Sequence, residues 1–150
     1  MIRIEYPPYQ PRIKQETGAQ GTAGKEMIFD EVRKKWIALT PEEWVRQNFL
    51  QYLIQVKAYP ASLIAVEKEI KLGELKKRFD IMLYDAATKP WMIVECKEMN
   101  VALNRQVLDQ VLRYNISLQV PYLVLTNGTH CMAFHLKDGK VQELDALPGL

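Results

Sequence analysis

Two neighbouring stretches, RFDIMLYD at residues 78–85 and WMIVECKE at residues 91–98, decide the fold class of this chain. Both are typical of β-strands, because apolar and aromatic residues recur in them with few breaks. The second stretch is a short apolar run that ends abruptly in Glu95-Cys96-Lys97. The alternation in the first stretch predicts two faces, one with Phe79, Ile81 and Leu83 and the other with Asp80, Met82 and Tyr84.

The segments around these strands predict a chain that mixes helices and strands. Thr40 and Pro41 are favourable residues for the start of a helix, and apolar residues follow at helical spacing to about Ala58. The apolar run PYLVLT at residues 121–126 is typical of a central strand that is covered on both faces. In chain order we expect a pair of strands in 27–39, this helix, strands at 63–72, 75–85 and 91–97, a helix at 103–118, and strands at 121–126 and 131–136.

Length and composition bound the class of protein. A chain of 150 residues has the size of one domain, and we expect an N-terminal arm and loop at 1–26 followed by a single domain at 27–150. The net charge of +2 does not by itself indicate a nucleic-acid partner, so a basic surface would have to be local. No apolar run reaches the roughly 20 residues that span a bilayer, and 2 cysteines are too few for a disulfide framework. We therefore expect a soluble, cytoplasmic protein with no membrane partner.

Asp80, Glu95 and Lys97 carry the strongest chemical signal. Asp80 interrupts an apolar strand, and Glu95 and Lys97, two residues apart at a strand end, point to the same face. Carboxylates that converge from neighbouring strands repel each other, and Mg²⁺ relieves this repulsion because it prefers oxygen ligands. A lysine beside the metal can hold an attacking water while the metal stabilises charge on a phosphoryl oxygen. These residues predict metal-assisted phosphodiester hydrolysis, and a solvated salt bridge is the alternative.

The sequence also resembles a known superfamily in this region. RFD at 78–80 and VECK at 94–97, within this order of helices and strands, resemble the PD-(D/E)xK nucleases. The sequence is most similar to one branch, the N-terminal nuclease domain of type I restriction enzyme R proteins, over about residues 27–136. TPEEWVRQ at 40–47, DQVLRYN at 109–115 and PYLVLTNG at 121–128 belong to the same similarity. Phe79 stands where the superfamily has a proline before the acid, a departure that this branch tolerates.

The resemblance implies a fold and a metal site. The fold would be α/β with a restriction-endonuclease-like (αβββαβ) core, a mixed sheet flanked by helices, and an N-terminal β-hairpin extension. Asp80 and Glu95 would bind the catalytic metal, Mg²⁺ with Mn²⁺ as a substitute. Lys97 would serve the attacking water.

A glutamate of the first helix often completes such a site, and this helix has two candidates. At about 100° per residue, Glu42 falls on the apolar stripe of the helix, whereas Glu43 lies about a quarter-turn away. Glu42 is therefore favoured, with Arg46 one turn below it as a partner. The alternative, that both glutamates merely cap the helix, stays open.

Four further residues are candidates for contacts with nucleic acid. Gln110 and Tyr114 share a helix face and match the Gln-x-x-x-Tyr element of this branch, which the resemblance places beside the active site. Spacing alone favours a simpler explanation, with Tyr114 packed at the core edge and Gln110 at the rim. Lys77 and Arg78 could contact phosphates, although such a run is usually a solvated turn, here diluted by acids such as Glu67.

The favoured function is that of a Mg²⁺-dependent DNA endonuclease in a restriction-modification setting, as a free-standing relative of the R protein nuclease domain. The sequence has no motor and no ATP site, so a motor or specificity subunit, or a second copy of the chain, is a candidate partner. The alternative is a catalytically silent module of the same fold that binds nucleic acid or a partner protein. The intact set of Asp80, Glu95 and Lys97 favours the enzyme, because a non-cutting descendant need not retain it.

Overall fold

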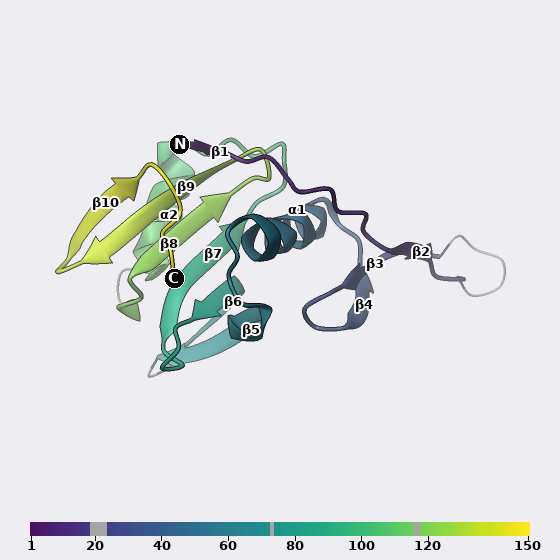
Figure 1. The fold of residues 1–150 in the computed structure, drawn as a ribbon, viewed down its shortest axis with the longest axis horizontal. Helices are drawn as coiled ribbons and strands as arrows, with labels where there is room; N and C mark the ends of the chain where they lie inside the picture. The colour runs from purple at the N-terminus through teal and green to yellow at the C-terminus, as the bar shows by residue number, and fades with distance from the viewer. Residues whose placement is uncertain (19–23, 73, 116–117) are drawn as a thin grey trace.

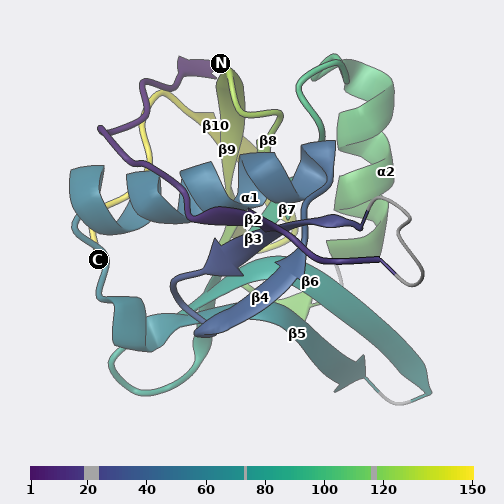
Figure 2. The ribbon, with the colours of Figure 1, turned by 90° about the vertical axis from the view of Figure 1, so that its right-hand side faces the viewer.

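The computed structural model describes residues 1–18, 24–72, 74–115 and 118–150. Residues 19–23, which belong to the expected N-terminal loop, lie outside the described part, as do residues 73, 116 and 117. Within that part, a 7-stranded sheet carries one α-helix on each face (Figure 1 and Figure 2). A 3-stranded sheet extends from the N-terminal side of the first helix (Figure 1).

The main sheet is mixed. Its strand order is β1-β9-β8-β7-β6-β5, and β10 also pairs with β9. β7 and β8 run parallel to each other, and the other neighbouring strands pair antiparallel. The parallel pair lies inside the sheet, which explains the uninterrupted apolar runs of these two strands. The strands are β1 (Ile2–Arg3), β5 (Ile64–Leu72), β6 (Leu75–Tyr84), β7 (Pro90–Cys96), β8 (Tyr122–Thr126), β9 (His130–Lys137) and β10 (Lys140–Leu144).

The first helix begins at its predicted cap. Thr40 Oγ1 accepts a hydrogen bond from the backbone N–H of Glu43 at 3.0 Å, which caps α1 (Pro41–Gln51). The path continues through a π-helical turn, η2 (Tyr52–Val56), so that it ends close to the predicted boundary, and η3 (Ala61–Leu63) precedes β5. The second helix, α2 (Arg105–Asn115), begins 2 residues after the start of the predicted segment 103–118, and residues 116 and 117 of that segment lie outside the described part.

Each face of the main sheet has its own hydrophobic core. The core under α1 contains Val45, Phe49, Leu53, Ile81, Leu83, Met92, Val94 and Cys96. The core under α2 contains Phe79, Met82, Ile93, Leu108, Val111, Leu123 and Leu125. Cys96 is 1% exposed and belongs to the first core. The two cores hold the sheet rigidly from both sides.

The side-chain alternation of β6 changes at Asp80. Ile81 and Leu83 pack in the α1 core, but Phe79 packs in the α2 core. The prediction that Phe79 shares a face with Ile81 and Leu83 is therefore wrong. The change occurs where Asp80 bonds to the backbone of β7, and where the facing residue Glu67 has a φ of +56°. Asp80 consequently lies on the α1 side of the sheet together with Ile81.

The N-terminal hairpin predicted within 27–39 consists of β3 (Glu26–Asp30) and β4 (Lys35–Ala38), and β2 (Ile13–Gln15) pairs with β3. Asp30 closes the turn, because its Oδ1 accepts the backbone N–H groups of Val32 and Arg33 at 2.8 and 2.7 Å. Asp30 and Ile28 are both fully buried, so β3 presents its alternate residues to the body of the protein.

The predicted mixed α/β class is confirmed, and the predicted strands between residues 27 and 136 are all present. The sequence does not predict β1, β2 or β10, which are edge strands with polar or short sequences and depend on their partners for stability. The identification of the order α1-β5-β6-β7-α2-β8 with a restriction-endonuclease-like core stays a prediction. No helix of the described residues is both long and apolar enough to cross a membrane.

Candidate active site

Asp80 lies where the pairing between β6 and β7 ends. The two strands pair up to Ile81 and Val94. At the next position, Asp80 Oδ2 accepts a hydrogen bond from the backbone N–H of Cys96 at 2.8 Å. The carboxylate takes the place of a backbone acceptor from β6, and this bond fixes it beside the end of β7.

Glu95 brings a second carboxylate to the same place from β7. Its side chain is 14% exposed, and its Oε1 lies 3.5 Å from Lys77 Nζ. Burial, the charge of Asp80 and a side-chain hydrogen bond with Asp80 raise the pKa of Glu95 to about 7, although Lys77 acts in the opposite direction. The two carboxyl groups therefore form a close, partly desolvated pair that resists carrying two negative charges.

Lys97 and Glu42 are the other two residues predicted for this site. Lys97 is half-buried, and its backbone N–H donates to the carbonyl of Thr126 at 2.8 Å. Glu42 remains exposed on the first turn of α1, but partial burial and the charge of Asp80 raise the pKa of its carboxyl group, while Arg46 and Lys97 lower it. Glu42 thus interacts with Asp80 and Lys97, and its part in the chemistry stays a prediction.

Glu43 belongs to an ion-pair network around Arg46. Arg46, expected beside Glu42, forms its ion pair within α1 with Glu43, at 2.6 Å from Nε to Oε2. Arg46 Nη1 also contacts Glu67 Oε1 and lies 3.3 Å from Asp80 Oδ1. Burial alone would lower the pKa of Arg46, but Glu43, Glu67 and Asp80 together raise it above its usual range. Arg46 therefore remains a permanent cation next to Asp80.

Glu67 is a residue of this site that the sequence does not reveal. It faces Asp80 in the antiparallel register of β5 and β6, between the pairs Val66–Ile81 and Lys68–Phe79. Its φ of +56° is left-handed, which is rare for a residue with a side chain. In the sequence, Glu67 belongs to a run of mixed charges that is typical of a solvated strand. The signal that could have found Glu67 is its position, because it lies as many residues from the turn between β5 and β6 as Asp80 does.

Some of the residues predicted to contact nucleic acid lie near this site. Lys77 lies beside Glu95, and its Nζ is 5.0 Å from the centre of the Phe79 ring. The side chain of Arg78 is 61% exposed and lies 3.7 Å from Glu67. Gln110 is exposed on α2, and the side chain of Tyr114 lies outside the described residues. These four roles remain predictions.

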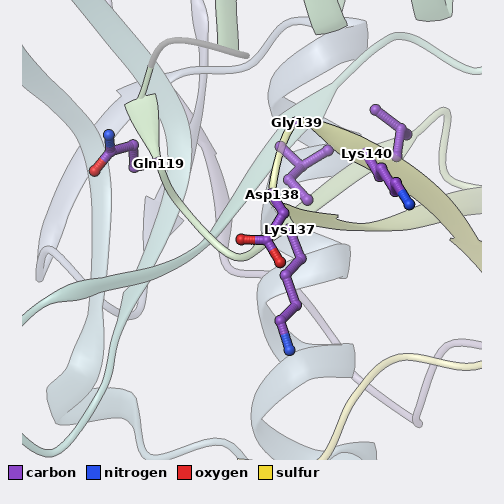
Figure 3. Close-up of a pocket in the computed structure, with 7 residues that line it drawn as sticks. Gln119, Lys137, Asp138, Gly139 and Lys140 are labelled. Carbon is purple, nitrogen blue, oxygen red and sulfur yellow. The ribbon is translucent and has the colours of Figure 1, made fainter.

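A cavity of about 390 Å³ lies at the other end of the main sheet (Figure 3). Its lining consists of Gln119 and residues 136–141, around the turn between β9 and β10. The backbone N–H of Leu136 donates a hydrogen bond to the carbonyl of Pro121, just before β8 begins, whereas Cys96 pairs with Thr126 at the end of β8. The length of β8 thus separates this cavity from Asp80. The lining of the cavity includes one acidic residue, Asp138.

Asp80 and Glu95 are the residues of this site whose chemistry could hold a metal ion. No group of 3 or more His, Cys, Asp or Glu side chains suited to a metal occurs within residues 1–18, 24–72, 74–115 and 118–150. A pair of carboxylates nevertheless matches the chemistry of Mg²⁺, which commonly binds one or two carboxylates and keeps several waters. The repulsion within the pair is the property that a cation would relieve.

The comparison with protein families identifies the relationship of the chain. Residues 41–148 match the family described as the type I restriction enzyme R protein N terminus (HSDR_N). The chain belongs to this family. The matched region of this HSDR_N member begins at α1 and contains the whole candidate site, whereas β2, β3 and β4 precede it. No curated protein sequence matches the chain.

A solved structure is similar to part of this HSDR_N member. It is a fragment of a protein described as an HsdR subunit of a type I restriction enzyme from Vibrio vulnificus YJ016. The similarity covers 57% of this chain and 19% of that chain, with 22% sequence identity and a TM-score of 0.41. The matched region thus spans about a fifth of the length of that fragment.

Proposed function

We propose that this HSDR_N member is a Mg²⁺-dependent DNA endonuclease with a restriction-endonuclease-like core. The observation that carries the proposal is the pair formed by Asp80 and Glu95. Their carboxyl groups meet at the position where two central strands stop pairing, and burial together with the charge of Asp80 raises the pKa of Glu95 to about 7. Strongly perturbed carboxylates of this kind are enriched at functional sites, because their proximity costs stability unless a cation binds.

The donor set fits Mg²⁺ or Mn²⁺. Asp80 Oδ1 and the Glu95 carboxylate would hold the ion, since Asp80 Oδ2 accepts the N–H of Cys96. When bound, the metal supplies positive charge that stabilises a phosphoryl oxygen. The bond from Cys96 supports this role because it fixes the orientation of Asp80 before any metal binds.

Lys97 is proposed to hold the attacking water. It follows Glu95 by two residues at the end of β7, and its backbone bond to Thr126 fixes the position of the main chain. Glu42 is the proposed third acid, since it interacts with both Asp80 and Lys97. With Glu42 nearby, the Lys97 amino group would orient the water toward the scissile phosphate.

Family membership and the charges near the site support the proposed substrate contacts and partners. Arg78 is an exposed cation beside the site and is proposed to contact a phosphate, as is Lys77. Gln110 and Tyr114 are proposed to place the nucleic acid from α2. A motor or specificity subunit of a type I restriction system, or a second copy of the chain, would be the protein partner, in a cytoplasmic restriction-modification setting.

The second candidate is a module of the same fold that binds nucleic acid or a partner protein without cutting. The position of Arg46 favours it, because a guanidinium 3.3 Å from Asp80 Oδ1 already neutralises part of the charge that a metal would neutralise. Such a module would keep the ion-pair network for stability alone.

Cleavage of supercoiled, linear and single-stranded DNA with Mg²⁺ or Mn²⁺ tests the proposal. Asp80→Asn and Lys97→Ala are expected to abolish cleavage by the full chain. Their matched controls are Asp138→Asn and Lys137→Ala, which make similar changes at exposed positions of the β9–β10 turn. Both controls are expected to cut as the wild type does.

The outcomes separate the two candidates. Cleavage that survives both site substitutions would contradict the assigned site. No cleavage by the wild type, together with no binding of Mn²⁺, would favour the silent module. Mn²⁺ binding without cleavage, lost in Asp80→Asn, would indicate a nuclease that needs a partner subunit.

A further inference from the structure

Arg46 lies between three carboxylates, one of which belongs to the proposed metal site. Its Nη1 contacts Glu67 Oε1 and lies 3.3 Å from Asp80 Oδ1, while its Nε lies 2.6 Å from Glu43 Oε2. The Arg46 side chain is 7% exposed, so water and salt screen these charges little. A guanidinium in this position competes with any other cation for Asp80.

The competition concerns one oxygen atom. Asp80 Oδ2 accepts the N–H of Cys96 at 2.8 Å, which leaves Oδ1 as the better ligand for a metal ion. Oδ1 is also the oxygen that Arg46 approaches. The affinity of Asp80 for a metal ion thus depends on how firmly other residues hold Arg46.

Glu67 is placed to hold Arg46. It faces Asp80 across the β5–β6 ladder, where two like charges are unfavourable unless a cation lies between them. Its φ of +56° is a conformation that residues with side chains keep when their surroundings fix it, often at functional sites. The carboxylate of Glu67 contacts the same Nη1 that approaches Asp80.

We propose that Arg46 and Glu67 are positioning residues of the metal site, in which Glu67 shares the Arg46 guanidinium with Asp80, weakens its pairing with Asp80 Oδ1 and thereby raises the affinity of the site for a divalent cation. The inference rests on the proposed function, since it takes Asp80 as a metal ligand. Glu43 holds the Nε edge of the guanidinium, so Arg46 stays next to the site without binding Asp80 alone.

Calorimetric titration of Mn²⁺ into the full chain, without DNA, tests the proposal. In Glu67→Gln, Arg46 loses a competing partner and pairs more closely with Asp80, so Mn²⁺ affinity is expected to fall about tenfold or more. Glu69→Gln is the matched control, because it removes the same charge from the same strand. Glu69 pairs with Arg78 and not with Arg46. Its effect is expected to stay below about twofold.

The deciding comparison repeats Glu67→Gln in an Arg46→Gln background. If Glu67 acts through Arg46, its loss has little effect there, and the double-mutant cycle measures the coupling. If Glu67 is a metal ligand or a simple source of charge, Glu67→Gln weakens Mn²⁺ binding equally in both backgrounds, which overturns the proposal. Equal effects of Glu67→Gln and Glu69→Gln overturn it as well.

Two controls keep the test decisive. Circular dichroism and urea unfolding check the fold. Arg46→Lys replaces Arg46→Gln if the latter does not fold, because an ammonium lacks the separate Nε and Nη donors with which the guanidinium reaches Glu43 on one edge and Glu67 and Asp80 on the other. The effect of Glu67→Gln is again expected to shrink. Mn²⁺ binding that Asp80→Asn abolishes but Glu67→Gln leaves unchanged overturns this inference alone. No binding by the wild type overturns the proposed function and this inference together.

Discussion

Asp30 and Glu95 are both acidic residues near the ends of strands, yet their surroundings differ. Asp30 is fully buried and accepts hydrogen bonds from the N–H groups of Val32 and Arg33, from Arg33 Nε and from Gln47 Nε2, all within 3.0 Å. Glu95 lies next to another carboxyl group, and Lys77 Nζ is 3.5 Å away. Asp30 thus has a full set of hydrogen-bond donors, and Glu95 does not.

The pKa values of the two acids record this difference. Burial would raise the pKa of Asp30, but its hydrogen bonds with Arg33 and Gln47 outweigh burial and lower it. Burial and Asp80 raise the pKa of Glu95 to about 7. A saturated carboxylate stabilises the fold, whereas a carboxylate pair short of donors is suited to bind a cation. This difference supports a structural role for Asp30 and a functional role for Glu95.

Ion pairs along α1 join the two regions. Arg33, the partner of Asp30, lies 3.6 Å from Glu43, and Glu43 pairs in turn with Arg46 at 2.6 Å. Arg46 then reaches Asp80. Gln47 and Arg46 are adjacent in α1, so one helix supplies donors to both regions. Substitutions in each region therefore show how far the two roles are separate.

The largest expected effect is the loss of DNA cleavage in Glu95→Gln. If Glu95 binds the metal as proposed, removal of its carboxylate costs several kcal/mol of transition-state stabilisation, so the rate should fall by about 1000-fold or more. Single-turnover cleavage of a labelled duplex at saturating metal measures it. Asp30→Asn, assayed below its unfolding temperature, should retain the wild-type rate. A cleavage defect in Asp30→Asn as large as that in Glu95→Gln would mean that the two roles are not distinct.

The second effect is a loss of stability in Asp30→Asn. The amide cannot accept the same set of donors, and Arg33 loses its buried partner, so the free energy of unfolding should fall by about 3 kcal/mol. Urea unfolding followed by circular dichroism measures the change. Glu31→Gln is the control, because its ion pairs with Arg12 and Lys34 lie at the surface and contribute less than about 1 kcal/mol. A loss below that of the control would contradict the structural role of Asp30.

The third effect is a dependence of stability on pH. The folded protein keeps a proton on Glu95 up to a pKa of about 7, whereas the unfolded chain releases it near 4.5, so metal-free stability should fall as the pH rises between these values. The fall is at most about 3–4 kcal/mol, since each pKa unit corresponds to about 1.4 kcal/mol. Unfolding curves at several pH values measure it.

Glu95→Gln should remove this part of the pH dependence, and the difference from the wild type isolates Glu95 from Glu42 and Glu43, whose pKa values are also raised. Asp30 affects the pH dependence of stability in the opposite direction. Its lowered pKa stabilises the fold at higher pH, and this contribution is lost as the pH falls through that pKa. Identical pH profiles of the wild type and Glu95→Gln would contradict the raised pKa.

The smallest effect separates two neighbouring glutamates. Glu43 is buried between Arg46 and Arg33, so Glu43→Gln should lower the free energy of unfolding by about 1–2 kcal/mol. Glu42 is exposed, and Glu42→Gln should change it by less than about 0.5 kcal/mol. If Glu42 is the third acid, its substitution instead slows cleavage. Equal unfolding curves for the two variants would show that the ion-pair network contributes little.

The sequence predicts the parts of this account that depend on local pattern. The strands that carry Asp80 and Glu95 follow from their apolar runs, and the start of α1 follows from Thr40 and Pro41. The proximity of Asp80 to Glu95 follows from their places on neighbouring strands of a hairpin. These features need little information beyond side-chain type and spacing.

The parts that the sequence does not predict depend on tertiary contacts. Nothing local indicates that Glu67 adopts a positive φ, or that Phe79 turns to the opposite face from Ile81. Both features arise where Asp80 bonds to Cys96 instead of continuing the ladder. The saturation of Asp30 likewise requires Gln47, which is distant in sequence.

Calorimetric titration of Mg²⁺ into the wild type, Asp80→Asn, Glu95→Gln and Asp138→Asn tests the central claim most directly. We expect one binding site per chain in the wild type and in Asp138→Asn, and no binding in the other two variants. Binding that persists without the Asp80 and Glu95 carboxylates, or a wild-type protein that binds no divalent cation, would contradict it.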